Sequence, residues 1–124
     1  MATSFSHACI VTRDVERLGA FYIDVLGWKT ENHDMGPMGT YTLFKVPGVE
    51  GDGGGMMGMP PGMEKSPSFW LAYIATADVD ASAKKVTDLG GKVKMPPTDI
   101  PNIGRFAVVE DPTGAAFALY KNAH

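Results

Sequence analysis

Of the three histidines in the chain, His7 is the one that lies in an apolar segment. An imidazole titrates near neutral pH, so it can act as a general acid or base or bind a divalent metal. No Asp or Glu is placed by the sequence to orient His7, and a hydrogen-bonded core histidine is the ordinary alternative. His33 falls in a polar stretch that we interpret as a solvated loop, and His124 is the last residue.

Two further residue types invite a chemical interpretation. Cys9 lies two residues after His7, and a Cys–His pair can generate a thiolate nucleophile. On one strand, however, side chains two residues apart are separated by roughly 7 Å, which favours a buried, inert thiol. Arg105 could bind an anionic group of a substrate or pair with a surface Asp or Glu, and the sequence leaves both open.

Methionines gather beside the glycines of residues 53–55. They form a soft surface that could fold over a ligand or pack against a second subunit. The glycine-rich segment lacks the Lys-Ser/Thr pair of a phosphate-binding loop, so we do not expect nucleotide binding.

These residues are positioned by an internal repeat. The segment T-R-D-V-E around Asp14 matches T-A-D-V-D around Asp78, 64 positions later, and the L-G pairs that follow are 63 positions apart. Asp14 or Thr12 can cap the first helix and Asp78 or Asp80 the second, and Gly27 and Gly90 suit the left-handed residue that ends a helix. The first helix has one predicted apolar stripe, made of Leu18, Phe21, Tyr22 and Val25.

Short β-prone segments surround both helices. Before them lie residues 5–11 and 69–75, and after them lie 28–31, 41–46 and a weak 55–59, then 92–95, 104–110 and 115–121. Residues 60–67 are rich in Pro and read as the linker. The predicted fold class is therefore α+β, with two β-α-β-β-β modules forming an eight-stranded cupped mixed sheet with helices outside. We predict one domain over residues 1–124, with module 1 at about 1–62 and module 2 at about 66–124.

The repeat, the T-x-D-V-[ED] helix starts, the L-G helix ends and the turn E-D-P-T-G resemble the vicinal oxygen chelate superfamily. That superfamily contains glyoxalase I, bleomycin-resistance proteins and extradiol dioxygenases. The segments M-G-T-Y-T, G-G-M-M-G-M-P and P-P-T-D-I-P-N-I-G-R-F resemble its glyoxalase/bleomycin-resistance-like bacterial members. The resemblance covers essentially the whole chain and implies a small ligand held in the cup of the sheet.

The resemblance also implies a site for one divalent ion, held by His and Glu from four strands. At the corresponding positions this chain has His7, then residues 54–57, then Trp70 or Leu71, and finally Ala118. Only His7 offers a good donor atom, because a thioether binds Zn²⁺ or Ni²⁺ poorly. We therefore expect no cofactor, a divalent metal being the less favoured case.

Alternation along the strands groups the residues of one face. If His7, Leu71 and Ala118 mark the inner face, Tyr73 and Tyr120 join them, whereas a shift of one residue would replace Tyr73 by Trp70. The wall would suit a flat or apolar ligand, or it simply fills the core. The predicted ligand-binding residues are His7, Met57, Leu71, Tyr73, Arg105, Ala118 and Tyr120, with His7 the one catalytic candidate.

Composition excludes several classes. The chain has 124 residues, 44% of them hydrophobic and 20% charged, with a net charge of −3 and scattered Lys and Arg. No basic face for nucleic acid, no membrane span and no secretory leader are visible. We expect a cytoplasmic homodimer that binds a small molecule, with the Met-rich strand and the linker as interface.

Three functions remain open. The favoured one is a metal-independent binding protein of the bleomycin-resistance type. The others are a metalloenzyme centred on His7, related to glyoxalase-like lyases or dioxygenases, and a metal-free enzyme that uses His7 as acid or base.

Overall fold

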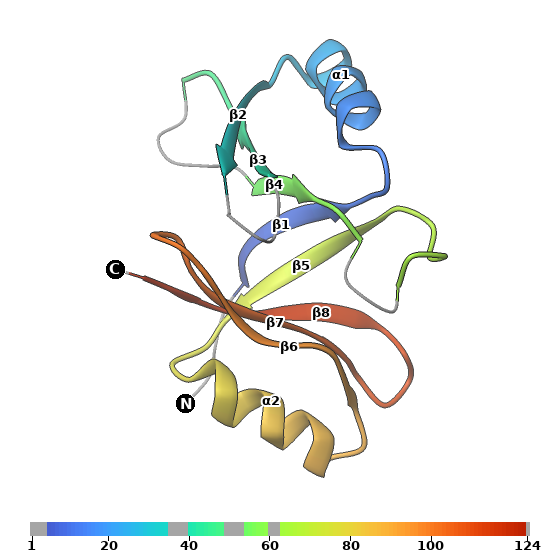
Figure 1. Ribbon diagram of the computed structural model, residues 1–124, viewed down its shortest axis with the longest axis vertical. Helices are drawn as coiled ribbons and strands as arrows, with labels where there is room; N and C mark the ends of the chain where they lie inside the picture. The colour runs from blue at the N-terminus through green and yellow to red at the C-terminus, as the bar shows by residue number, and fades with distance from the viewer. Residues whose placement is uncertain (1–4, 35–39, 49–53, 60–62, 124) are drawn as a thin grey trace. The chain divides into compact units, whose positions relative to one another are not determined.

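The computed structural model describes residues 5–34, 40–48, 54–59 and 63–123. His124, Gly53 and the first residues of the predicted linker, 60–62, lie outside the described residues. The elements of the first repeat, in chain order, are β1 (Phe5–Val11), α1 (Val15–Leu26), β2 (Lys29–Asp34), β3 (Thr40–Lys45) and β4 (Gly54–Met57). Those of the second are β5 (Phe69–Ala75), α2 (Val79–Asp88), β6 (Lys92–Ile100), β7 (Gly104–Glu110) and β8 (Ala116–Asn122). The predicted succession β-α-β-β-β therefore occurs twice (Figure 1).

The eight strands belong to one mixed sheet in the order β2-β3-β4-β1-β5-β8-β7-β6. Within each repeat the first and last strands are parallel: Cys9 pairs with Gly55, and Tyr73 pairs with Ala118. These pairs lie at equivalent places in the two repeats, so the duplication seen in the sequence is also a duplication of register. The α+β fold class with two repeated modules is confirmed.

The contacts divide the chain into two compact units. Unit 1 contains the described residues 5–7 and 71–123, and unit 2 contains those of 8–59 together with 63–70. The boundary passes through β1 and β5, so the two units do not coincide with the two repeats. The prediction of one domain with module limits near residues 62 and 66 stays a prediction.

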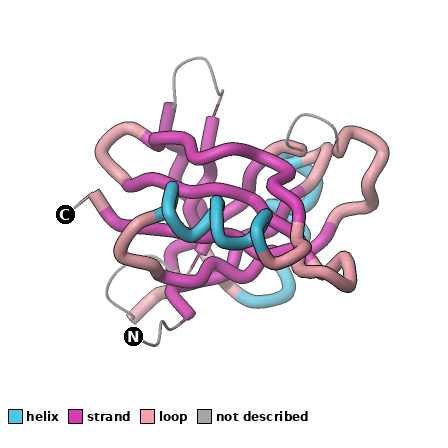
Figure 2. The backbone as a smooth tube through the Cα atoms, turned by 90° about the horizontal axis from the view of Figure 1, so that it is seen from below, coloured by secondary structure: helices cyan, strands magenta, loops and turns pink. Residues whose placement is uncertain are grey.

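Each unit has a helix packed on one face of its strands (Figure 2). In unit 1, Val79 and Ala83 of α2 pack against Ala107 and Val109 of β7 and Leu119 of β8. The strand residues in this core alternate with those of the opposite face, as a sheet buried on both sides requires.

In unit 2, α1 packs against Ile10, Phe44 and Met56. From α1, Val15, Leu18 and Tyr22 contact this core, but Phe21 and Val25 are more than half exposed, at 55% and 59%. The predicted apolar stripe is therefore only partly covered by the sheet. The stripe is wider than the face of a helix that one sheet covers.

Two strands, β2 and β6, run well past their predicted ends. β2 continues to Asp34, so His33 lies in a strand and not in a loop, with Nε2 3.0 Å from Glu31 Oε1. β6 runs on to Ile100 through two prolines, with register shifts on either side of Met95. Proline is tolerated there because β6 is an edge strand, where a missing N–H need not break the ladder.

The helix starts are confirmed at atomic detail. Asp14 Oδ1 accepts a hydrogen bond from Arg17 N at 3.0 Å, and Asp78 Oδ1 accepts one from Ala81 N at 3.0 Å. Gly27 ends α1 in the left-handed region, with φ of 70°. The two helices therefore begin through the same interaction of a side-chain carboxylate with a free N–H of the first turn.

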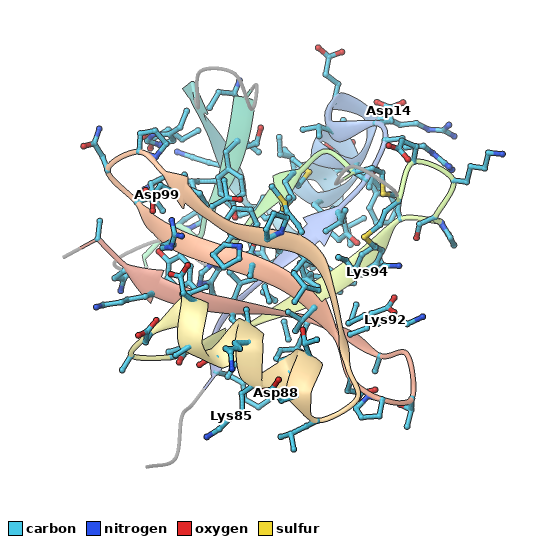
Figure 3. The ribbon with its side chains drawn as sticks, turned by 60° about the horizontal axis from the view of Figure 1, so that its bottom comes forward. Asp14, Lys85, Asp88, Lys92, Lys94 and Asp99 are labelled. Atoms are coloured by element: carbon cyan, nitrogen blue, oxygen red, sulfur yellow. The ribbon has the colours of Figure 1, made fainter. Side chains whose placement is uncertain are left out.

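We expect Asp78→Ala to lower the free energy of unfolding by about 1 kcal/mol, since the first turn of α2 loses its cap. Urea denaturation would measure this. Asp88→Ala, in the last turn of the same helix (Figure 3), is the control and should be close to neutral, because the loss of its exposed ion pair with Lys84 is offset by removal of a carboxylate that opposes the helix dipole. Equal losses in the two variants would contradict the capping role.

Candidate functional site

Four aromatic rings lie together on one face of unit 1, and we call His7, Tyr73, Phe106 and Tyr120 the aromatic cluster. The His7 ring lies 4.5 Å from the Tyr73 ring and meets the Tyr120 ring edge-on at 5.0 Å. Tyr73 is also stacked on Phe106, with centroids 6.1 Å apart and an interplanar angle of 15°. These are the separations and orientations at which aromatic pairs attract one another.

The strand register brings these rings to the same face. Phe106 of β7 pairs with Tyr120 of β8, and Tyr73 of β5 pairs with Ala118, two residues before Tyr120. Because alternate residues share a face, Leu71 and Ala118 belong to the face of the aromatic cluster. Trp70 points the other way: it is 49% exposed and meets Tyr22 of α1 edge-on. The register that includes Tyr73 is therefore correct, and the alternative with Trp70 is wrong.

Tyr120 is held in place by a glycine and two oxygens. A Cβ on Gly104 would come within 2.9 Å of Tyr120 Cε1 and 2.3 Å of the Lys121 carbonyl oxygen, so only glycine fits beneath this ring. The Tyr120 hydroxyl donates to Asn122 Oδ1 at 2.7 Å and lies 3.2 Å from the Ile103 carbonyl oxygen. The ring thus has one well-defined position next to His7.

His7 is half-buried, and its Nδ1 lies 2.8 Å from the Ser6 hydroxyl. Its ring contacts two tyrosines that are 1% and 5% exposed, so His7 is the most accessible member of an otherwise buried cluster. The hydroxyl and the two rings restrict how the imidazole can turn. Its roles as ligand-binding residue and catalytic candidate stay predictions.

The residues at the positions of the family's metal ligands do not fit a metal. Leu71 and Ala118 are fully buried and carry no donor atom. Gly55 occupies the position in unit 2 that corresponds to Ala118, and it has no side chain. Among the described residues, no group of three or more His, Cys, Asp or Glu is placed to hold a metal ion.

Arg105 lies on the opposite face of β7 from Phe106, towards α2. Its Nε and Nη2 each lie 2.9 Å from a carboxylate oxygen of Asp80, and its Nη1 lies 3.0 Å from Asp99 Oδ1. The hydrogen bonds of Arg105 lower the pKa of the Asp80 carboxyl, and the two carboxylates raise the pKa of the guanidinium. Of the two interpretations of Arg105, pairing with acidic residues is the one observed, and it ties α2 to β6 and β7.

Unit 2 contains a second polar pair that sequence reasoning missed. Cys9 Sγ lies 2.5 Å from the Tyr41 hydroxyl, and both residues are buried. Cys9 is buried as predicted. Gly55 makes room for the Tyr41 ring, since a Cβ there would lie 2.9 Å from Cε1.

The predicted site residue Met57 belongs to unit 2. Met57 is 7% exposed and Met56 is 1% exposed, Met56 being packed beneath α1. These side chains are therefore in the core, and the expectation that the Met-rich strand offers an interface surface is wrong for both residues.

Sequence reasoning named Tyr73 and Tyr120 but missed Phe106. The signal was present, because Gly104, Phe106 and Val108 alternate along one strand with the residues that pack on α2.

A groove of about 680 Å³ in unit 2 was also missed. It lies beside α1, and its lining includes Glu16, Ala20 and Ile23 of the helix and Thr30, Asn32 and Thr42 of the strands.

Comparison with known proteins decides the family. The model of the Glyoxalase/Bleomycin resistance protein/Dioxygenase superfamily matches residues 4–119. The chain belongs to this superfamily. The resemblance seen in the sequence is confirmed, and the repeated modules are those of the vicinal oxygen chelate fold.

Two groups of curated relatives match. The chain is 38% identical over 104 residues to "Putative glyoxylase CFP32" of Mycobacterium bovis, which covers 84% of this chain and 38% of that protein. It is 36% identical over 118 residues to "Anthracycline biosynthesis protein DnrV" of Streptomyces peucetius, covering 87% of this chain and 43% of that one. The chain thus spans about two fifths of the length of these relatives.

Solved structures match in fold. A methylmalonyl-CoA epimerase from Streptomyces coelicolor is 20% identical, with a TM-score of 0.68 and full coverage of both chains. The enzyme of the same name from Mycobacterium tuberculosis is 17% identical, with a TM-score of 0.65, covering 98% of this chain and 89% of that one.

Among the described residues, no helix is long and apolar enough to cross a membrane.

The contact between Arg105 and Asp80 makes a prediction about pH. The pKa of Asp80 lies below its ordinary value of 3.8 in the folded protein, so the pair stabilises the fold above that pH. The stabilisation is lost as the pH falls through the folded pKa. We therefore expect the stability difference between the wild type and Arg105→Gln to be present at pH 7 and to shrink below about pH 4.

Urea denaturation at pH 7 and pH 3 measures this. Lys84→Gln removes a more exposed i,i+4 ion pair, 3.5 Å long, and is the control, for which we expect a smaller effect. A difference for Arg105→Gln that is as large at pH 3 as at pH 7 would show that Arg105 stabilises by packing and not by its charge.

Proposed function

We propose that this protein is a metal-independent small-molecule-binding protein of the glyoxalase/bleomycin-resistance type. The observation that carries the proposal is the aromatic cluster of unit 1. Its four rings come from four consecutive strands of the sheet, β1, β5, β8 and β7, and share one face. Binding sites for small molecules are mostly apolar, with a few polar groups that fix orientation. Here the polar groups are the His7 imidazole and the Tyr120 hydroxyl.

The chemistry of the cluster favours a flat, apolar ligand. Tyr73 and Phe106 are nearly parallel but buried, at 1% exposed each, so an aromatic ligand would extend the stack at the half-buried His7 ring, which lies against Tyr73. Two relatives are named for anthracycline biosynthesis, and an anthracycline contains a planar fused-ring system. We infer that the ligand class of this chain is a planar polycyclic aromatic compound.

The donor atoms at the family positions support independence from metal. Three of the four family positions have Leu71, Ala118 and Gly55, so a divalent ion would have one imidazole ligand from the family set. Stable metal sites in proteins use three or four protein ligands. Protein dialysed against buffer without chelator, after incubation with Zn²⁺, Ni²⁺, Mn²⁺ or Fe²⁺, should therefore retain far less than one metal per chain by plasma mass spectrometry. Near-stoichiometric metal would overturn this part of the proposal.

Ligand binding is tested by isothermal titration calorimetry with two soluble probes. Anthraquinone-2-sulfonate is planar and aromatic, and 1-adamantanecarboxylate is apolar, bulky and not planar, while both carry one negative charge. We expect the wild type to bind the planar probe more tightly. Tyr73→Leu should weaken that binding about three- to tenfold, because it removes the ring that holds His7 in place and retains apolar volume.

Phe117→Leu is the matched control. Phe117 lies on β8 beside Ala118, but it packs against the α2 core on the other face of the sheet. The same aromatic-to-leucine change there should leave the affinity unchanged. Equal weakening in both variants, or no preference for the planar probe, would contradict a binding site at the aromatic cluster.

A further inference from the structure

The groove beside α1 contains a carboxylate with no cation beside it. Its volume of about 680 Å³ is within the range of small-molecule sites. Val15, Ile23 and Met56 give it apolar walls, and Glu16 is the charged residue of its lining. Among the residues that the structure describes, Glu16 forms no ion pair. The groove therefore has space for a ligand and a negative charge to attract it.

Polar side chains of β2 and β3 form another wall of the groove. Thr30 pairs with Phe44, which is in the core beneath α1, and Asn32 pairs with Thr42, so all of them share the face that α1 covers. The buried Thr42 hydroxyl donates to Asn32 Oδ1 at 2.8 Å and orients the amide. Hydroxyl and amide oxygens accept hydrogen bonds, so this wall suits a ligand that carries N–H donors.

The second repeat shows what neutralises the same carboxylate in unit 1. Glu16 is the second residue of α1, and Asp80, 64 positions later, is the second residue of α2. Arg105 donates from Nε and Nη2 to the two carboxylate oxygens of Asp80, each at 2.9 Å, and from Nη1 to Asp99. A guanidinium from the sheet thus binds the carboxylate at the start of α2.

The strand register identifies the residue of unit 2 that corresponds to Arg105. Across β6 and β7, Arg105 pairs with Asp99, and the corresponding pair across β2 and β3 is Thr40 with Asp34, each member 65 positions earlier. The pairing of β3 with β4 and of β7 with β8 gives the same correspondence. Unit 2 therefore has acidic residues at the positions of Asp80 and Asp99, but threonine at the position of the cation.

We propose that the groove binds a small organic cation, whose planar guanidinium-type head takes the place that Arg105 occupies in unit 1. The head pairs with Glu16, and an apolar body lies against Ile23 and Met56. A guanidinium suits this place because its planar N–H groups bind two carboxylate oxygens at once, as those of Arg105 do with Asp80. The site belongs to unit 2 and does not depend on the aromatic cluster of unit 1.

An NMR titration of the ¹⁵N-labelled full chain tests the proposal with two probes, benzylguanidinium and benzylurea, which are alike in shape but differ in charge. We expect benzylguanidinium to bind at least about fivefold more tightly and to shift the amide signals of the groove residues. Glu16→Gln should weaken this binding about three- to tenfold, because it removes the charge and retains the size of the side chain. Asp24→Asn makes the same charge change on α1 at a residue that does not line the groove, and should leave the affinity unchanged.

A second pair of variants tests the comparison between the repeats. Thr40→Arg places a guanidinium at the position of Arg105, so it should compete with the probe and weaken its binding at least about tenfold. Thr40→Gln adds a long side chain without charge and should have a much smaller effect. Circular dichroism and the thermal midpoint would show that each variant is folded.

Three results would each overturn the proposal: equal affinity for the two probes, equal effects of Glu16→Gln and Asp24→Asn, or unchanged affinity in Thr40→Arg. Tyr73→Leu separates this site from the aromatic cluster, because it should leave the affinity for benzylguanidinium unchanged. Loss of that affinity in Tyr73→Leu would place the probe at the aromatic cluster and would also contradict a site in the groove.

Discussion

The pairing register of β5, β8 and β7 is the constraint on which the aromatic cluster depends. Tyr73 opposite Ala118 and Phe106 opposite Tyr120 place every second side chain of three adjacent strands on one face. A slip of one residue would turn Tyr73 towards α2 and bring Trp70 to the face of the cluster. The register is held from the other face, where Ala107, Val109 and Leu119 fill the core beneath α2. The core and the candidate site are therefore two sides of the same strand pairings.

Duplication explains what the two repeats share, and divergence explains where they differ. Both helices start from an aspartate cap, and both repeats pair their first and last strands in parallel at equivalent residues. In each unit a tyrosine ring lies over a glycine of the neighbouring strand: Tyr41 over Gly55, and Tyr120 over Gly104. The strand that carries the tyrosine is the third of the first repeat but the fourth of the second. The equivalent faces of the two units therefore differ in chemistry. Unit 2 has the thiol–phenol pair of Cys9 and Tyr41, and unit 1 has the aromatic cluster.

The sequence was sufficient for the features that depend on local rules. Asp14, Gly27 and Asp78 mark helix ends by their own chemistry, and the repeat predicted the succession of helices and strands along the chain. It was insufficient where tertiary context decides. His33 was assigned to a loop because its neighbours are polar, but polar residues are accommodated in β2 because it is an edge strand. The exposure of Phe21 and Val25 could not be predicted, because periodicity defines an apolar stripe but does not say how much of it the sheet covers. The contacts of Arg105 with Asp80 and Asp99 join segments far apart in the chain, which no local pattern predicts.

The loss of metal donors and the presence of the aromatic cluster are linked through burial. Leu71 and Ala118 are fully buried beside Tyr73, so a carboxylate introduced at either position would be placed among apolar groups. A buried charge is strongly unfavourable unless a partner neutralises it, and a metal neutralises it only when several donors are present together. Converting a face with one metal donor into a face with four, one substitution at a time, would therefore pass through proteins with unpaired buried charges. Those proteins would be less stable than either end point. Packing by aromatic and aliphatic side chains stabilises the donor-poor face, and the histidine that remains is held by its contacts with Tyr73, Tyr120 and Ser6.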